Sequence, residues 1–237
     1  KKGISLLSAF LGFVMEKPPW KKADKVICVS EHVKKELEEL YNKRKNIDII
    51  GASIDIKKFK QRNKKNSKKR VGLNQDNWYG LYVGRGGYWT KGLDRVIGIS
   101  KEIYKKDKNY RLLVIGPEKE KIKDIINRNF IIFIPEIIRE YLPYYYNSAD
   151  VFFNLSRYEG GDPTLSTGEA MASGCLVVCS KDAKQEIIKN GKNGLLIGGE
   201  YNKEAEKIIN VLNNKKKFNG IIKNSFNIIR KLSYLID

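Results

Sequence analysis

Residues 156–174, "SRYEGGDPTLSTGEAMASG", lie between two apolar runs, "ADVFFNL" directly before them and "LVVCS" shortly after them. Short apolar runs bounded by turn residues are typical of strands that are buried on both faces of a sheet. Between the runs, Asp162 and Pro163 predict an N-cap and a first helical residue, and Gly174 predicts the end of that helix. The order strand, turn, helix, strand predicts a βαβ unit with two parallel strands.

The same alternation of strand and helix patterns runs along most of the chain. Further strands are predicted at residues 25–30, 47–52, 80–84, 111–116, 130–134 and 194–197. Helices are predicted at residues 31–41, 91–106, 119–128, 137–149, 164–173 and 183–190. Near-continuous apolar strands that alternate with amphipathic helices predict an α/β fold, a doubly wound, mostly parallel, Rossmann-like sheet with helices on both faces. This pattern extends from about residue 70 to the end of the chain.

Residues 57–70, "KKFKQRNKKNSKKR", interrupt the alternation with a lysine-rich segment that has no strand pattern. Such a segment is predicted to be a linker or an exposed loop. The strand and helix patterns before it are too short to form a Rossmann domain alone. We therefore expect two parts: residues 1–56, a remnant of a preceding domain with its linker, and residues 57–237, the Rossmann-like domain.

The chain carries a large excess of positive charge, with 46 lysine and arginine residues against 27 aspartate and glutamate residues and a formal net charge of +19. This excess predicts an anionic partner: a nucleic acid, an acidic membrane surface or a phosphorylated ligand. An AT-rich genome explains the frequent lysine, asparagine and isoleucine residues equally well. Residues 57–70 are either a contact with anionic lipid or a solvated loop without such a role.

Cysteine and histidine are too few for several classes of site. Cys28, Cys175 and Cys179 form no Cys-x-x-Cys pair, and His32 is the only histidine. Zinc sites and histidine-based catalytic triads are therefore not expected, and no metal is predicted. Buried, reduced thiols fit a cytoplasmic protein. No apolar run reaches the roughly 20 residues of a membrane span, and residues 4–15 are predicted to form a buried helix.

In an open α/β sheet, ligands bind at the carboxyl ends of the strands, so the residues that follow each strand are candidate site residues. After the predicted strand at 80–84 comes a loop with Arg85, two glycines and then Lys91. Glycine lets the backbone approach a ligand closely, and two cations can neutralise a phosphate or a diphosphate. The alternative is an ordinary turn with solvated charges.

Carboxylates follow the predicted strand "ADVFFNL". Glu159 and Asp162 precede the predicted helix, and Glu169 lies about two turns into it. A helix N-terminus is suited to an anion; the alternative is a capped helix whose glutamates face solvent. Because the cations, the helix N-terminus and the carboxylates all fall at one edge of the sheet, together they predict a ligand that carries both a diphosphate and sugar hydroxyls.

Several segments recur in one known family in the same order, among them "ADKVICVSEHVKKEL", "LYVGRGGYWTKGLDRVI", "YYYNSADVFFNLSRYEGG", "GEAMASGCLVV" and "QEIIKNGKNGLLI". On these motifs the chain resembles the group 1 (family 4) retaining glycosyltransferases of the GT-B fold, over about residues 23–197. The resemblance implies two Rossmann-like domains that face each other across a cleft, an N-terminal one for the acceptor and a C-terminal one for the nucleotide-sugar donor. The chain would hold the donor domain, one half of the GT-B fold, and a remnant of the acceptor domain.

The resemblance also implies roles for individual residues. Arg85 and Lys91 would bind the donor diphosphate and act in catalysis together with Glu159, which would contact the transferred sugar near its 3-hydroxyl. Glu169 would bind the ribose hydroxyls. The family usually has about seven residues between the two glutamates, whereas this chain has nine, which makes Asp162 a rival for the sugar contact. The predicted donor site is Gly84, Arg85, Gly86, Lys91, Glu159, Gly160, Gly161, Asp162, Pro163, Thr164, Leu165 and Glu169.

We therefore expect an enzyme, a retaining glycosyltransferase of the hexosyltransferase type, whose activity this fragment alone need not have. It would transfer a sugar from a nucleoside-diphosphate donor, such as a UDP- or GDP-sugar, to an unknown glycan, lipid-linked or protein acceptor, without a metal or a further cofactor. Alternatives are another sugar-nucleotide enzyme of the same fold, such as an epimerase, and a non-catalytic basic module that binds nucleic acid or a membrane. Nucleic acid is the partner least expected. The expected location is the cytoplasm, with peripheral contact at a membrane.

Overall fold

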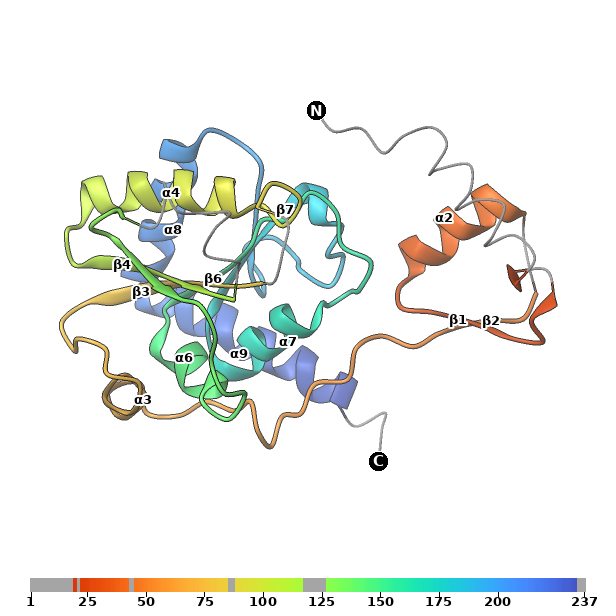
Figure 1. The fold of residues 1–237 in the computed structure, drawn as a ribbon, viewed down its shortest axis with the longest axis horizontal. Helices are drawn as coiled ribbons and strands as arrows, with labels where there is room; N and C mark the ends of the chain where they lie inside the picture. The colour runs from red at the N-terminus through yellow and green to blue at the C-terminus, as the bar shows by residue number, and fades with distance from the viewer. Residues whose placement is uncertain (1–18, 21, 43–44, 85–87, 117–126, 234–237) are drawn as a thin grey trace. The chain divides into compact units, whose positions relative to one another are not determined.

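A computed structural model (Figure 1) describes residues 19–20, 22–42, 45–84, 88–116 and 127–233. Its contacts divide the chain into two units, Lys1–Ala52 and Ser53–Asp237, whereas the sequence analysis put a boundary after residue 56. The helix predicted at 4–15, most of the one predicted at 119–128, and the two loop residues Arg85 and Gly86 lie outside the described residues.

The first unit contains one strand–helix–strand segment. Strand β1 (Val26–Cys28) pairs in parallel with β2 (Ile47–Ile49), and helix α2 (Glu31–Tyr41) connects them. Ser30 caps α2, because its hydroxyl accepts a hydrogen bond from the backbone N–H of Val33 at 3.3 Å. The strands predicted at 25–30 and 47–52 and the helix predicted at 31–41 are confirmed.

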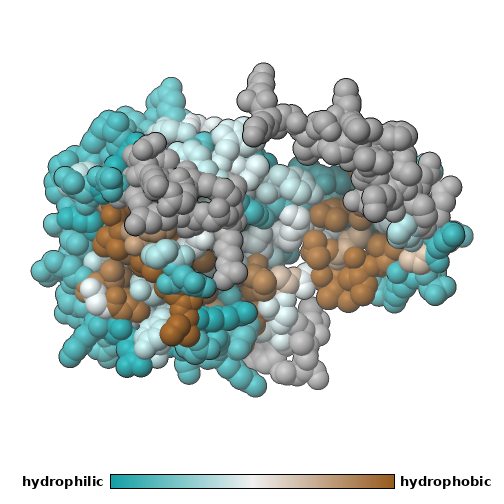
Figure 2. Space-filling model, viewed as in Figure 1, coloured by the Kyte–Doolittle hydropathy of each residue, from teal (hydrophilic) through white to brown (hydrophobic). Residues whose placement is uncertain are grey.

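The two-stranded sheet leaves apolar side chains of the first unit uncovered. Ile27 and Ile50 are 60% and 55% exposed, and Figure 2 shows a hydrophobic area on this unit. Two-stranded sheets are marginally stable by themselves, and uncovered apolar side chains of this kind are typical of a surface that another element covers. The described part of the first unit is therefore too small to be a stable domain by itself.

The second unit is built on a six-stranded sheet in which every neighbouring pair of strands is parallel. The strand order is β5-β4-β3-β6-β7-β8. The strands are β3 (Trp78–Val83), β4 (Tyr110–Ile115), β5 (Ile131–Ile134), β6 (Val151–Asn154), β7 (Leu176–Ser180) and β8 (Leu195–Ile197). Every predicted strand is confirmed, and with them the doubly wound, Rossmann-like α/β fold.

Helices cover both faces of this sheet, α4 and α8 on one face and α6 and α7 on the other (Figure 1). Helix α9 serves both layers, because Ile221 packs in the hydrophobic cluster of α4 and α8 whereas Ile229 packs in the cluster of α7. Helices α8 and α9 were not predicted from the sequence. The helices are α3 (Lys64–Arg70), α4 (Leu93–Lys106), α6 (Leu142–Ser148), α7 (Leu165–Ser173), α8 (Tyr201–Asn213) and α9 (Lys215–Ser233).

The helix predicted at residues 183–190 is wrong. A single 3-10 turn, η2 (Lys181–Ala183), is followed by Lys184, whose left-handed backbone, with φ 51°, ends it. In the segment that follows, the backbone N–H of Ile187 donates to the carboxylate of Asp162 rather than to a backbone carbonyl. Side chains that bind backbone groups in this way compete with helix formation.

The prediction of a linker or loop for residues 57–70 is wrong for α3, which is part of the folded domain. Asn63 caps this helix, and the helix packs against α6. Lys68 of α3 is buried, and its ammonium donates to the backbone oxygens of Gln75 and Asn77, at 3.1 and 2.6 Å. Fewer lysines of this segment therefore remain for a membrane surface.

Cys28, Cys175 and Cys179 are buried free thiols, as predicted. Within the described ranges, no helix combines the length and the apolar character needed to cross a bilayer. Among the same residues, no group of three or more histidine, cysteine, aspartate or glutamate side chains is arranged to hold a metal ion.

We expect Lys68→Met to lower the free energy of unfolding by about 1–3 kcal/mol, because the hydrogen bonds from the buried ammonium to the backbone oxygens of Gln75 and Asn77 are lost. Lys65→Met is the matched control on the same helix: Lys65 is exposed, so its replacement should change stability by less than about 0.5 kcal/mol. Urea unfolding followed by circular dichroism measures both. Equal stability of the two variants would show that the buried ammonium has no structural role.

Candidate functional site

The order of the strands reverses between β3 and β6, which lie side by side although β4 and β5 come between them in the sequence. At such a switch point the loops after the two strands run in opposite directions and leave a crevice, which is where open α/β sheets bind ligands. The predicted site residues follow these two strands, Gly84 and Lys91 after β3 and residues 156–164 after β6.

The structure brings Lys91 and Glu159 together across this crevice. The ammonium of Lys91 donates to both carboxylate oxygens of Glu159, at 3.0 and 2.9 Å. The hydroxyl of Ser156 donates to the same carboxylate at 2.6 Å. The Glu159 side chain is 12% exposed and that of Lys91 is 41% exposed. A mostly buried carboxylate thus faces a cation that a ligand in solvent can also reach.

Arg157 holds the two loops in this arrangement. Its guanidinium makes a two-pronged ion pair with Asp94, at 3.0 and 2.7 Å, and also donates to the backbone oxygen of Trp89. The guanidinium carbon lies 3.9 Å from the centre of the Trp89 ring, and the backbone N–H of Arg157 donates to the backbone oxygen of Thr90 at 3.0 Å. The loop after β6 is therefore fixed to the loop before α4, with Lys91 between Thr90 and the helix.

Gly92 is required where these loops meet. Its φ is 69°, and a Cβ at this position would lie 1.9 Å from the backbone oxygen of Leu155. Any other residue would push the start of α4 away from the end of β6. The glycine therefore lets Lys91 come within hydrogen-bonding distance of Glu159.

Asp162 does not cap α7, which corrects the sequence analysis. The N-cap is Thr164, whose hydroxyl accepts from the backbone N–H of Thr167 at 3.3 Å, and Pro163 lies outside the helix. The two carboxylate oxygens of Asp162 accept from the backbone N–H of Ile187, at 3.0 and 3.1 Å. Asp162 thus joins the start of α7 to the segment after β7, a role that a spacing rule for caps does not reveal.

Glu169 lies inside the domain and does not face solvent. It is 7% exposed, and it accepts a hydrogen bond from the hydroxyl of Tyr146 at 3.0 Å. Burial raises the pKa of the Glu169 carboxyl above its ordinary value, while the Tyr146 hydrogen bond and the charges of Arg139 and Lys58 act in the opposite direction. Ionisable groups with a perturbed pKa in a crevice are frequent at functional sites.

The remaining predicted residues follow the same two strands. Gly84 continues β3 and donates its N–H to the backbone oxygen of Ile115 at 3.1 Å. Gly160 and Gly161 form the turn before α7, and the Gly161 oxygen accepts from the amide of Gln185. Leu165 is the first residue of α7. Arg157 and Asp94 were not predicted from the sequence, although an acidic residue in the first turn of a helix is a recognisable partner for an arginine.

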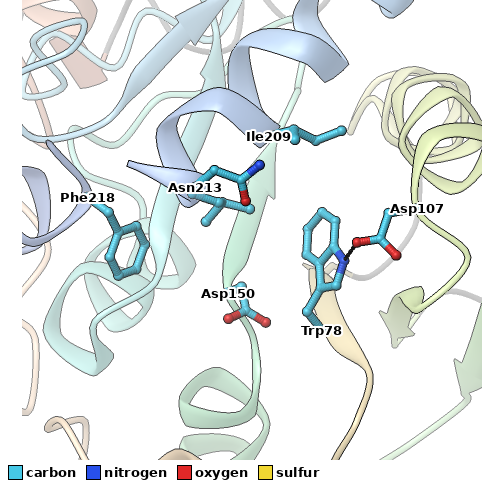
Figure 3. A pocket seen from close by; sticks show the side chains of 7 residues that line it. Trp78, Asp107, Asp150, Ile209, Asn213 and Phe218 are labelled. Atoms are coloured by element: carbon cyan, nitrogen blue, oxygen red, sulfur yellow. Dashed lines mark hydrogen bonds between the residues drawn. The ribbon is translucent and has the colours of Figure 1, made fainter. Parts of the chain in front are cut away.

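A cavity of about 280 Å³ lies at the opposite edge of the sheet. Trp78 begins β3 and Asp150 precedes β6, so these lining residues mark the amino ends of the strands; Figure 3 shows them with Asp107 and residues of α8 and α9. The cavity is therefore on the wrong side of the sheet for the predicted donor. It is lined by Trp78, Asp107, Asp150, Ile209, Leu212, Asn213 and Phe218.

The two carboxylates of this cavity take part in the fold. Asp107 accepts from the indole N–H of Trp78 at 2.7 Å, the dashed line in Figure 3. Asp150 accepts from the backbone N–H of Tyr79 at 2.9 Å and from the ammonium of Lys64 at 2.5 Å. Both carboxylates therefore join the strands to the neighbouring helices, and the cavity is not a candidate for the donor site.

A Rossmann-like domain with a cation, carboxylates and a helix start at its switch point belongs to the class that binds nucleotide-like ligands. The family model described as glycosyl transferases group 1 matches residues 63–227 of the chain. The chain therefore belongs to the glycosyl transferases group 1.

Curated relatives agree with this family. The chain is 27% identical over 241 residues to a protein of Methanocaldococcus jannaschii named "Uncharacterized glycosyltransferase MJ1069". The matched region covers 93% of this chain and 59% of that protein. It is 28% identical over 172 residues to the "Amylovoran biosynthesis glycosyltransferase AmsD" of Erwinia amylovora. This match covers 71% of this chain and 47% of that protein. The chain thus spans about half the length of the curated relatives that it matches.

Solved structures share the fold. The sucrose-phosphate synthase of Thermosynechococcus elongatus has a TM-score of 0.83 at 23% identity, over 98% of this chain and 60% of that one. The Anabaena protein Alr3699/HepE, solved in complex with UDP and glucose, has a TM-score of 0.78 at 18% identity, over 98% of this chain and 66% of that one. At these identities the likeness is one of fold.

We expect Glu169→Gln to stabilise the chain at pH 7. The folded-state pKa of Glu169 is raised, so its ionisation costs stability once the pH passes the unfolded pKa of about 4.3. Glutamine avoids this cost and can still accept from Tyr146. Thermal unfolding should show a higher midpoint than the native chain at pH 7 and a smaller difference near pH 4.

Glu186→Gln is the control for this measurement, because Glu186 is exposed on the segment after β7. A midpoint for Glu169→Gln at pH 7 that lies below that of the native chain would mean that the ionised carboxylate stabilises the fold.

Proposed function

We propose that the second unit is the donor-binding half of a retaining glycosyltransferase that takes its sugar from a nucleoside diphosphate. The observation that carries the proposal is the contact of Lys91 with Glu159 at the switch point, in a chain of the glycosyl transferases group 1. The complex of the Anabaena protein with UDP and glucose supports a nucleoside-diphosphate donor of the same general kind.

The distance between Lys91 and Glu159 fits the chemistry of such a donor. The transferred sugar is bonded directly to the terminal phosphate, so a cation for that phosphate and a carboxylate for a sugar hydroxyl must lie close together. The ammonium and the carboxylate are 2.9 Å apart. Glu159 suits the sugar contact better than its rival Asp162, whose two carboxylate oxygens accept from the backbone of Ile187.

Glycosyl transfer breaks the bond between the anomeric carbon and the phosphate oxygen, through a transition state in which the sugar resembles an oxocarbenium ion. Negative charge grows on the departing diphosphate, and stabilising such charge is usually the largest contribution of an enzyme. Lys91 would supply this stabilisation, with Arg85 from the adjoining segment outside the described residues. The departing phosphate would take the proton of the acceptor hydroxyl, which then bonds to the anomeric carbon on the face that the phosphate leaves.

Glu169 is the proposed contact for the ribose. Ribose hydroxyls donate hydrogen bonds, and a buried carboxylate gains from additional donors. Among the described residues, the Tyr146 hydroxyl donates to one of the two oxygens of Glu169. The base, the sugar and the acceptor stay outside this proposal, as does contact of residues 57–70 with a membrane.

The alternatives are less well supported. An epimerase relies on acid–base side chains, and the single histidine, His32, belongs to the first unit. A non-catalytic basic module has no specific observation in its favour.

Lys91→Ala should weaken the binding of UDP or GDP about tenfold or more, because a charge-assisted contact with a phosphate is worth roughly 1.5–3 kcal/mol. Lys101→Ala is the matched control, an exposed lysine of α4, and should leave the affinity unchanged. Isothermal titration calorimetry with UDP and GDP measures both variants.

The same titrations in excess EDTA test metal independence, which we propose because the cations of the site can neutralise the diphosphate. Equal affinities of the Lys91→Ala variant and the native chain, or binding that strictly requires Mg²⁺ or Mn²⁺, would contradict this model of the site.

Substitutions of the two glutamates should weaken the binding of different sets of ligands. Glu169→Gln should weaken both UDP and UDP-glucose, since ribose is common to them, whereas Glu159→Gln should weaken UDP-glucose alone. Calorimetry with the two ligands, or with GDP and a GDP-sugar, distinguishes these patterns. If Asp162→Asn selectively abolishes binding of the sugar nucleotide while Glu159→Gln keeps it, the sugar contact belongs to Asp162.

A further inference from the structure

Tyr82 lies on β3 beneath the proposed donor site. Its side chain is 3% exposed and packs in the cluster that faces α4, among residues such as Leu93 and Leu155. Successive residues of a strand point to opposite faces, so Tyr82 shares its face with Gly84, two residues nearer the carboxyl end.

The ring of Tyr82 runs along the strand toward that carboxyl end. A Cβ built on Gly84 would lie 2.8 Å from the Tyr82 hydroxyl oxygen and 3.0 Å from the ring carbon that carries it. The hydroxyl therefore occupies the space that any side chain at position 84 would need. Since β3 ends at Val83, the hydroxyl reaches the edge of the sheet where Lys91 and Glu159 meet.

This hydroxyl is buried and has no hydrogen-bond partner within the part of the chain that the structure describes. Three other buried tyrosines differ in this respect: Tyr79 donates to the backbone oxygen of Asn74, Tyr110 bonds with Ser100, and Tyr146 donates to Glu169. A buried hydroxyl without a partner lowers stability, and phenylalanine would avoid that loss. The hydroxyl therefore calls for an explanation outside the folding of the domain.

The charges of two carboxylates affect the pKa of the Tyr82 hydroxyl, although neither carboxylate accepts a hydrogen bond from it. Burial raises the pKa of Tyr82 most, and Glu159 and then Asp94 raise it further. Asp94 is held by the guanidinium of Arg157. The hydroxyl thus stays protonated, as a hydrogen-bond donor.

A diphosphate at the site would compete for Lys91. An ammonium has three N–H donors, and Lys91 donates to both oxygens of Glu159. N–H donors that turn to phosphate oxygens no longer bond to Glu159. Leaving a mostly buried carboxylate without its cation costs free energy. Another donor close to Glu159 would lower that cost.

We propose that Tyr82 is a positioning residue for Glu159: when a nucleoside diphosphate binds Lys91, the Tyr82 hydroxyl donates to the Glu159 carboxylate in place of the ammonium. The exchange keeps the carboxylate oriented toward the sugar and frees the cation for the phosphate. The ligand class is the diphosphate of a sugar donor, so the inference rests on the proposed function.

Tyr82→Phe removes only the hydroxyl and tests the exchange in the full 237-residue chain. By calorimetry the variant should bind UDP, or GDP in a parallel series, about five- to tenfold more weakly, because Glu159 then keeps Lys91. Its thermal midpoint should equal or exceed that of the native chain. Tyr110→Phe is the matched control: it breaks the bond with Ser100, so it should lower the midpoint and leave the affinity unchanged.

A second substitution gives a readout that a merely structural role would not change. Glu159→Gln removes the charge that competes for Lys91, so adding it to Tyr82→Phe should restore the UDP affinity to that of Glu159→Gln alone. A Tyr82→Phe affinity equal to the native one, or an equal loss with and without Glu159→Gln, overturns the inference. Both outcomes differ from failure of the proposed function, in which the native chain binds neither UDP nor GDP.

Discussion

The proposed site depends on the contact of Arg157 with the loop before α4. This loop and the loop after β6 come from strands that are neighbours in the sheet and distant in the sequence, so no local structure holds them together. Arg157 does so through Asp94, through the backbone of Trp89 and Thr90, and over the Trp89 ring. Guanidinium suits this purpose because its planar donors pair with a carboxylate in two places and can stack on an aromatic ring.

The carboxylates after β6, unusual in so basic a chain, have separate environments. Glu159 faces a cation that solvent also reaches, Asp162 binds the backbone after β7, and Glu169 is buried under the hydroxyl of Tyr146. Excess lysine does not decide these environments, since a surface ammonium interacts weakly with a distant carboxylate in water. Contacts within about 3 Å decide these environments. As a result, Asp162 has a structural role, whereas Glu159 and Glu169 have proposed ligand-binding roles.

The sequence predicted the strands well because strands buried on both faces are short apolar runs, and it predicted the edge of the sheet because parallel strands end together. It failed where side chains act across the fold. Lys68 looks solvated in a run of lysines, yet carbonyl oxygens from a later segment bind it. Asp162 looks like a helix cap, yet a loop beyond the next strand uses it. The spacing of residues in the sequence does not reveal the hydrogen-bond partners of Lys68 and Asp162, because tertiary packing brings these partners together.

The contact of Lys91 with Glu159 also explains how a site can be well ordered and still bind a charged ligand. Two opposite charges that satisfy each other keep the loops in one geometry, and in the proposed function a diphosphate would displace part of that contact. The affinity for the proposed donor would then be a difference between two sets of hydrogen bonds, and other hydrogen-bond donors to Glu159 would help to set it. Ser156 already donates to this carboxylate, whereas the Tyr82 hydroxyl, next to Gly84 after β3, is buried and without a partner among the described residues. A buried hydroxyl without a partner lowers stability. The proposed exchange at Glu159 would give that hydroxyl a function.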